Sequence, residues 1–132
     1  MKKKVILVII ILIILIFLCS LGFFKYKEYK KLKENKRYEE IISDFEKAVI
    51  WELDATNLSS KKCEENISKS VLLTTKYLNS QGYLDLDVMK DIDGKSYCKA
   101  YAKTFETEDC GVDYNIYIKC KNYETKGYAG WE

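Results

Sequence analysis

The chain has 132 residues, a length that allows a single small domain. Its 22 lysine and arginine residues nearly balance its 20 aspartate and glutamate residues, and the two signs are interspersed beyond residue 24. We therefore expect no nucleic-acid partner, because such partners require a strongly basic surface. The chain has no histidine and no proline, and its richness in lysine, isoleucine, asparagine and tyrosine is typical of bacterial proteins from AT-rich genomes.

Residues 5–24 form an uncharged run, VILVIIILIILIFLCSLGFF. About 20 helical residues at 1.5 Å each cover the hydrocarbon core of a bilayer, so the run predicts a transmembrane helix. A cleaved secretory signal is the alternative, because lysines precede the run and Ser20-Leu21-Gly22 matches a cleavage site. The run is longer than the apolar part of most signals, which favours a signal anchor. Cys19 follows Leu18 instead of the small residue of lipoprotein signals, and we interpret it as an apolar filler.

Two features disagree about the orientation of this span. A dense group of basic residues follows it and favours a cytoplasmic C-terminal part. These residues are Lys25, Lys27, Lys30, Lys31, Lys33, Lys36 and Arg37. Four cysteines beyond the span instead suit two disulfides in an oxidising compartment. We expect a cytoplasmic N-terminus and an extracytoplasmic C-terminal part at the cell membrane, because the signal-like start and the paired thiols agree.

The helix is predicted to continue through residues 25–54, since neither glycine nor proline interrupts them. Residues 25–37 are nearly all polar and predict a solvated stalk. From Tyr38 onward, apolar residues recur at intervals of three and four, which predicts a face packed on a head domain. The residues on this face are Tyr38, Ile41, Ile42, Phe45, Ala48, Val49 and Leu53.

Residues 64–80 are predicted to form a second helix, with Gly82 as its stop signal. Residues 85–90 predict a short helical turn. A tight turn is then expected at Asp93-Gly94, because glycine adopts a positive φ at little cost.

Two segments of alternating pattern, residues 97–105 and 112–122, predict an antiparallel hairpin. When Cys98 faces Cys120, one face carries only apolar or small residues. Its pairs are Ala100/Ile118, Ala102/Ile116 and Thr104/Tyr114. The other face, predicted to be solvated, carries Tyr97/Lys121, Lys99/Lys119, Tyr101/Tyr117 and Lys103/Asn115. A shift by one residue would turn the lysines into the core, so this register is expected.

These elements predict an α+β fold with a long N-terminal helix, a second helix and a small antiparallel sheet of two or three strands. The tail, YETKGYAGWE, is predicted to add the third, edge strand, with Trp131 closing over the sheet. The expected parts are a basic start and transmembrane helix at 1–24, a stalk helix at 25–54 whose second half packs on the head, and a disulfide-stapled head at 55–132.

The cysteines are candidates for a metal site, a redox site or disulfides. A structural zinc site draws its ligands from close cysteine pairs, which the spacing of this chain lacks, and thiol redox catalysis favours a C-x-x-C motif. Two disulfides are therefore predicted, one between Cys98 and Cys120 within the hairpin and one between Cys63 and Cys110. Each is expected to help stabilise a head whose core is small.

Four aspartates cluster before the hairpin and could be acid/base groups or calcium ligands. They are Asp85, Asp87, Asp91 and Asp93. An EF-hand loop would need an acidic or amide residue at Met89 and a glutamate at Ala100, so the calcium pattern fails at both ends. We predict solvated loop charges, with no catalytic residue, metal or cofactor.

Aromatic residues crowd the C-terminal end of the chain. They either form a surface that binds a protein or glycan, or fill strands because tyrosine suits a half-buried pleated surface. The candidates for such an interaction surface are Tyr97, Tyr101, Tyr117, Tyr123, Tyr128 and Trp131.

Three stretches carry a family resemblance: LTTKYLNSQGYL at 73–84, Asp93-Gly94-Lys95 with Cys98, and YIKCKNYETKGY at 117–128. Together with the basic start and single membrane helix, they resemble type IV pilin-like and pseudopilin-like proteins, and most closely the short membrane-anchored surface proteins of low-GC Gram-positive bacteria. In such proteins a small helix ending in Gly-Tyr-Leu leads into a strand pair that carries cysteines. The prepilin cleavage motif is absent, because Gly22-Phe23 follows the apolar run.

The sequence thus favours a non-enzymatic, single-pass surface protein for pilin-like assembly or adhesion. Its expected partners are the lipid bilayer and proteins, including copies of itself, met through the membrane helix and stalk. A membrane-tethered ligand-binding or enzymatic head is an alternative, and it requires a concave pocket near residues 85–93. A small subunit or regulator of a membrane complex is another.

Overall fold

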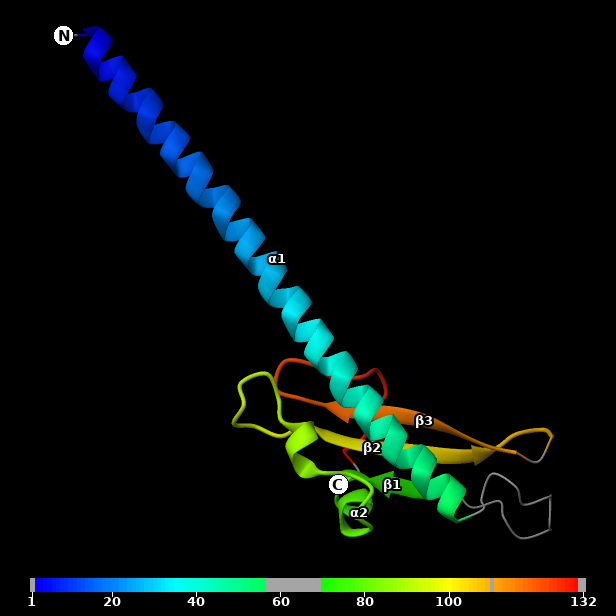
Figure 1. The fold of residues 1–132 in the computed structure, drawn as a ribbon. Coiled ribbons are helices and arrows are strands. Elements are labelled where there is room, and N and C mark those ends of the chain that lie inside the picture. The colour runs from blue at the N-terminus through cyan, green and yellow to red at the C-terminus, as the bar shows by residue number, and fades with distance from the viewer. Residues whose placement is uncertain (1, 57–69, 110, 131–132) are drawn as a thin grey trace. The chain divides into compact units, whose positions relative to one another are not determined.

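The structure is a computed structural model that describes residues 2–56, 70–109 and 111–130, with side chains from residue 4 onward. The helices are α1 (Lys2–Ala55), α2 (Thr75–Ser80) and the 3-10 helix η2 (Leu86–Met89), and the strands are β1 (Leu72–Thr74), β2 (Lys99–Glu106) and β3 (Val112–Lys119). Figure 1 shows their order along the chain. This is the predicted α+β fold. The chain divides into two compact units, Met1–Lys36 and Arg37–Glu132.

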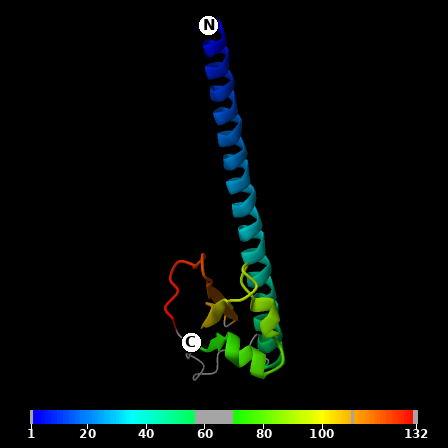
Figure 2. The ribbon, with the colours of Figure 1, turned by 90° about the vertical axis from the view of Figure 1, so that its left-hand side faces the viewer.

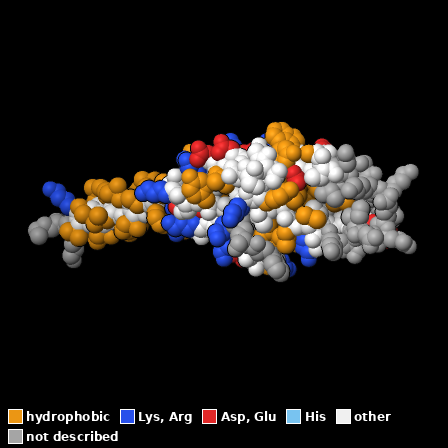
Figure 3. All heavy atoms as spheres, turned by 90° about the horizontal axis from the view of Figure 1, so that it is seen from below, with side chains coloured by type: hydrophobic (Ala, Val, Ile, Leu, Met, Phe, Trp, Pro, Cys, Tyr) orange, Lys and Arg blue, Asp and Glu red, His pale blue; other side chains and the backbone are white. Residues whose placement is uncertain are grey.

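The first unit contains the N-terminal part of α1. The large apolar side chains of residues 5–24 are all between 46 % and 69 % exposed. Hydrophobic side chains cover this segment on the face seen in Figure 3, and basic side chains lie at its ends. A helix of this length and composition could cross a membrane.

The second unit contains the C-terminal part of α1, which packs through one face. Tyr38, Ile41, Phe45, Ala48, Val49 and Leu53 are buried, and Ile42 is partly buried against them. The predicted packing face is therefore confirmed. Complete burial of a large apolar side chain contributes about 1.5–3 kcal/mol, so this face is a main source of the unit's stability.

The sheet has the strand order β1-β2-β3, and both pairs are antiparallel. The predicted hairpin register is confirmed: Ala100 pairs with Ile118, and Tyr101 with Tyr117. Ala100, Ala102 and Ile118 belong to the same buried cluster as the residues of α1. The C-terminal part of α1 thus covers one face of the sheet (Figures 1 and 2), while Tyr128 and Ala129 of the tail contact Tyr101 on the other face.

The second helix is shorter than predicted, because its expected middle forms β1 instead. Leu72 and Leu73 pair with Lys103 and Ala102 of β2, and Leu73 is buried in the core. Thr74 then accepts a hydrogen bond from the backbone of Tyr77 and caps the start of α2. Sheet pairing therefore overrides the helical pattern up to Thr74.

The end of α2 follows the prediction. Gly82 has a φ of 80°, and the backbone N–H groups of Gly82 and Tyr83 donate to the carbonyls of Asn79 and Leu78. This pair of bonds is a Schellman motif, which favours glycine because of the positive φ. The short helical turn predicted at 85–90 is present as η2.

The tail does not form the predicted third strand, which β1 supplies. The described part of the tail contacts β3 through an isolated bridge between Lys119 and Glu124. In addition, Thr125 N donates to the carbonyl of Ile118, and the Thr125 hydroxyl accepts from Ile118 N. Trp131, predicted to close over the sheet, lies outside the described residues.

Arg37 fixes η2 against α1. Its Nε and Nη2 donate to the carbonyl of Lys90 at 3.1 and 2.7 Å, and Nη2 also donates to the carbonyl of Val88 at 3.1 Å. Hydrogen bonds from a charged donor contribute more than neutral ones. The turn that leads from η2 towards β2 is thus anchored on the helix.

Candidate functional site

A disulfide joins the segments that flank the hairpin. Cys98 precedes β2 and Cys120 follows β3, and their sulfur atoms are bonded, as the register predicts. Both residues are buried in the core. Cys63 and Cys110, predicted to form a second disulfide, lie outside the described residues, and Cys19 is a free, exposed cysteine.

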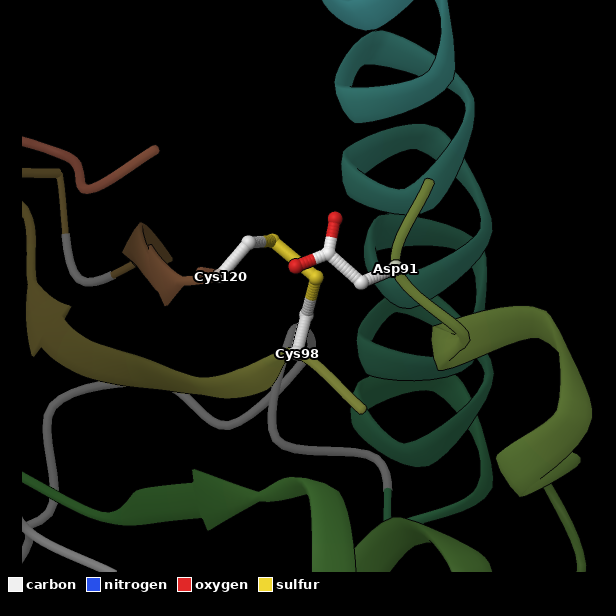
Figure 4. A group of neighbouring side chains, drawn as sticks. All are labelled: Asp91, Cys98 and Cys120. Carbon is white, nitrogen blue, oxygen red and sulfur yellow. A yellow bond between two sulfur atoms is a disulfide. The ribbon is translucent and has the colours of Figure 1, made fainter. Parts of the chain in front are cut away.

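Asp91 lies beside this disulfide, as Figure 4 shows. Its side-chain oxygen and the two sulfur atoms all lie within 4.8 Å of one another. The prediction of a solvated charge is wrong for this residue, which is only 3 % exposed. Its carboxylate is instead satisfied by backbone donors: Oδ1 accepts from Ile92 N at 2.6 Å, and Oδ2 from Lys121 N at 2.7 Å.

Asp91, Cys98 and Cys120 are residue types that bind metals, but their ligand atoms are already engaged in other bonds. Metals bind the thiolate form of cysteine, and both sulfurs here are committed to the disulfide. The carboxylate is likewise occupied by two N–H donors. We therefore interpret the cluster as a structural joint that ties the turn after η2 to the end of the hairpin.

Replacement of Asp91 by alanine is expected to lower the free energy of unfolding by about 1–3 kcal/mol, because the hydrogen bonds of its buried carboxylate to Ile92 N and Lys121 N are lost. Asp91→Asn should cost less, since its amide oxygen can still accept one of these bonds. Chemical denaturation of the full chain in bilayer nanodiscs measures both. Asp87→Ala is the control, because Asp87 is exposed and its loss should leave stability unchanged. Equal stability of the Asp91→Ala variant and the wild type would contradict the joint.

The other three aspartates are exposed and shape the local chain. Asp85 caps η2 by accepting from the backbone of Asp87, and Asp93 accepts from the backbones of Lys95 and Ser96. The hydroxyl of Ser96 also donates to Asp93, and these hydrogen bonds hold the pKa of the Asp93 carboxyl well below its usual range. Gly94 has a φ of 66°, as the predicted tight turn requires. These carboxylates form turns and do not converge on one point.

The structure does not gather the candidate aromatic residues on one surface. Tyr101, predicted to lie on a solvated face, is only 2 % exposed, which corrects that prediction. Its ring lies against Tyr117 and Tyr128, with centroids 5.0 and 5.4 Å away, and its hydroxyl accepts from Ala129 N. The tail therefore covers this part of the sheet, which the strand pattern alone did not reveal.

Of the remaining aromatic candidates, Tyr123 packs in the core and Tyr97 is exposed. Tyr123 stacks on Tyr38 of α1 with ring centroids 4.8 Å apart, and it contributes to the core. Tyr97 is 52 % exposed and stands in the segment before β2. Trp131 lies outside the described residues. Of the candidate set, Tyr97 is the one described member whose side chain faces mainly outward.

Two tyrosines outside the candidate set bind carboxylates of α1. The hydroxyl of Tyr77 donates to Glu52 at 2.6 Å, which raises the pKa of Tyr77. The hydroxyl of Tyr114 donates to Glu46 at 3.1 Å, and burial together with this bond raises the pKa of Tyr114 to about 12. Both pairs attach α1 to its neighbours and leave the tyrosines protonated at neutral pH.

A pocket of about 470 Å³ opens beside Tyr97. It lies between the start of α2, η2 and the segment that enters β2. Its lining residues are Thr74, Thr75, Lys76, Asn79, Leu86, Met89, Tyr97, Cys98 and Lys99. Sequence reasoning missed this pocket, because three segments separated in the chain form it and no motif marks it. Its position includes part of the 85–93 segment, where a ligand-binding head would require a concave surface.

Comparison of the chain with models of known protein families, with curated protein sequences and with solved structures finds no match.

Proposed function

We propose that this chain is a single-pass membrane protein whose head, Arg37–Glu132, lies on the extracytoplasmic side. The single observation that carries the proposal is the buried Cys98–Cys120 disulfide in a chain that also has a membrane-length apolar helix. Disulfides of this kind persist in oxidising compartments. The exposed apolar surface of residues 5–24 supports anchoring, because a soluble protein rarely leaves so large an apolar surface uncovered.

In this proposal the head binds or assembles and does not catalyse a reaction. The four candidate aspartates are engaged in turns and in the joint beside the disulfide, and Glu46 and Glu52 accept tyrosine hydrogen bonds, which supports this role. Assembly or adhesion at the cell surface, through the membrane helix and the polar segment that follows it, is the form of this role that the pilin-like resemblance favours.

Two variants, each with one added cysteine, test the topology. Lys126→Cys places a thiol on an exposed position of the head, and Lys4→Cys places one before the span. In intact bacterial cells, a membrane-impermeant maleimide should label the Lys126→Cys variant and should label Lys4→Cys only after permeabilisation. The unmodified chain, treated in the same way, gives the background from the native cysteines.

The protein should also stay in the membrane fraction after alkaline extraction. Release by alkali would contradict the anchor, and labelling of Lys4→Cys in place of Lys126→Cys in intact cells would reverse the orientation.

A ligand-binding head is the second candidate, and one observation favours it. The pocket beside Tyr97 has a volume within the range of small-molecule sites, about 300–1,000 Å³. A head of this kind is compatible with the same anchor and the same orientation, so the labelling experiment does not decide between binding and assembly.

A further inference from the structure

We propose that the pocket between α2, η2 and the start of β2 binds a small anionic amphiphile, a molecule with an apolar body and one carboxylate or phosphate group. This inference rests on the second candidate function, the ligand-binding head. Three properties of the lining carry it: apolar side chains, uncharged polar side chains that bond within the fold, and two lysines that form no ion pair with the described carboxylates.

The floor and one wall of the pocket are apolar. The buried side chains of Met89 and Cys98 lie at its base, while Leu86 is 43 % exposed and Tyr97 is 52 % exposed at its edge. Met89 is fully buried and supports the lining from beneath, while the ring of Tyr97 offers a flat contact surface. A ligand that covers Leu86 and Tyr97 would remove apolar surface from water, which favours an apolar body.

Three uncharged polar residues of the lining, Thr74, Thr75 and Asn79, form hydrogen bonds within the fold. Thr74 accepts from Tyr77 N as the cap of α2, and the hydroxyl of Thr75 both donates to the carbonyl of Ala100 and accepts from its N–H. The amide of Asn79 donates to the carbonyl of Leu84 at 2.7 Å. These groups hold the pocket walls in place, so they contribute little to recognition of a polar ligand.

The charged groups of the lining are the ammonium groups of Lys76 and Lys99. Both side chains are exposed, and neither forms an ion pair within residues 4–56, 70–109 and 111–130. Other lysines of the head do have partners; Lys90, for example, pairs with Asp87 at 2.9 Å. None of the described residues that line the pocket carries a carboxylate. A negative ligand group therefore meets two positive charges there, whereas a cationic ligand would be repelled.

The test uses Met89 as an internal probe. The chain has two methionines, Met1 and Met89, so labelling of methionine methyl groups with ¹³C gives one signal from the pocket floor. The full chain is placed in phosphatidylcholine nanodiscs, because a detergent would itself be an amphiphile. Octanoate, nonanoate and decanoate are then titrated while the Met89 methyl signal is followed by NMR.

The signal should shift in a saturable way, and each added CH₂ group that becomes buried should tighten Kd about fourfold. Decyltrimethylammonium, which has the same chain length and the opposite charge, should bind at least tenfold more weakly than decanoate. An unmoved Met89 signal, or an equal response to the cation, would overturn the proposal.

Variants separate binding in the pocket from partition into the lipid. Lys76→Gln combined with Lys99→Gln should weaken decanoate binding about fivefold, since two exposed ionic contacts are lost. Lys103→Gln is the matched control, because it removes an exposed lysine of β2 that does not line the pocket. Leu86→Asp should abolish the shift. Wild-type affinity in either pocket variant would overturn the proposal, and circular dichroism of each variant confirms that it is folded.

The source of the ligand is a further outcome. A shift of the Met89 signal in phosphatidylglycerol nanodiscs without any additive would identify an anionic lipid of the bilayer as the occupant. A shift with alkanoate alone would identify a free acid. An unmoved Met89 signal together with correct maleimide labelling would overturn the ligand inference and leave the proposed anchor and orientation standing.

Discussion

Replacement of Phe45 by alanine is expected to lower the free energy of unfolding of the Arg37–Glu132 unit by about 3–5 kcal/mol. Phe45 is fully buried at the centre of the face through which α1 packs on the sheet. The loss combines the transfer free energy of the ring with the cost of the cavity left behind. Urea unfolding of the full chain in nanodiscs, followed by the near-ultraviolet circular dichroism of the tyrosines, measures it.

Ile50→Ala is the matched control for the Phe45 variant. Ile50 lies on the same helix but is 41 % exposed, so its truncation should change the free energy of unfolding by no more than about 0.5 kcal/mol. A Phe45→Ala variant as stable as the Ile50→Ala variant would mean that α1 is not part of the core of the head.

Removal of the disulfide, by Cys98→Ala with Cys120→Ala, is expected to destabilise the head by about 3 kcal/mol. The bond closes a loop with a sequence separation of 22 residues, and the chain-entropy relation gives a stabilisation of this size for such a loop. The same urea titration measures it, with the wild type and the double variant expected to reach the same midpoint when both are in excess dithiothreitol.

Cys19→Ala controls for cysteine loss as such, since Cys19 is a free, exposed residue of the apolar run. Its urea midpoint should equal that of the wild type. A wild-type midpoint that is unchanged by reductant would contradict a stabilising role for the Cys98–Cys120 bond.

The hairpin was predictable because two independent patterns agree on it. Alternation places Ala100 and Ala102 on one face and the lysines on the other, and the positions of Cys98 and Cys120 select the same register. A shift by one residue would bury lysines, so a single register satisfies both patterns. The packing face of α1 was predictable for a similar reason, since its apolar spacing persists over several turns.

Other features depend on contacts that no local pattern encodes. Residues 72–74 fit a helical pattern, yet pairing with β2 makes them a strand. Asp91 stands in a polar segment that is typical of a solvated turn. Its carboxylate accepts from Lys121 N, 30 residues away, and only the fold brings the two together. Tyr101 belongs to the lysine face of the hairpin by alternation, and the tail covers it all the same. The pocket could not be predicted either, because its walls come from segments that are separated in the chain and meet only in the fold.

The turn between η2 and β2 is held by hydrogen bonds within its own backbone. Asp91 N donates to the carbonyl of Ser96 at 2.9 Å, Gly94 N donates to the carbonyl of Asp91 at 2.9 Å, and Lys90 bridges Tyr97 at its base. Its shape is thus set by its own backbone together with the anchored Asp91. For protein engineering, the exposed tip around Lys95 is the position where an epitope or dye would disturb the head least. That tip belongs to the same short connection as the pocket wall at Tyr97, so a dye there would report directly on the neighbourhood of the pocket.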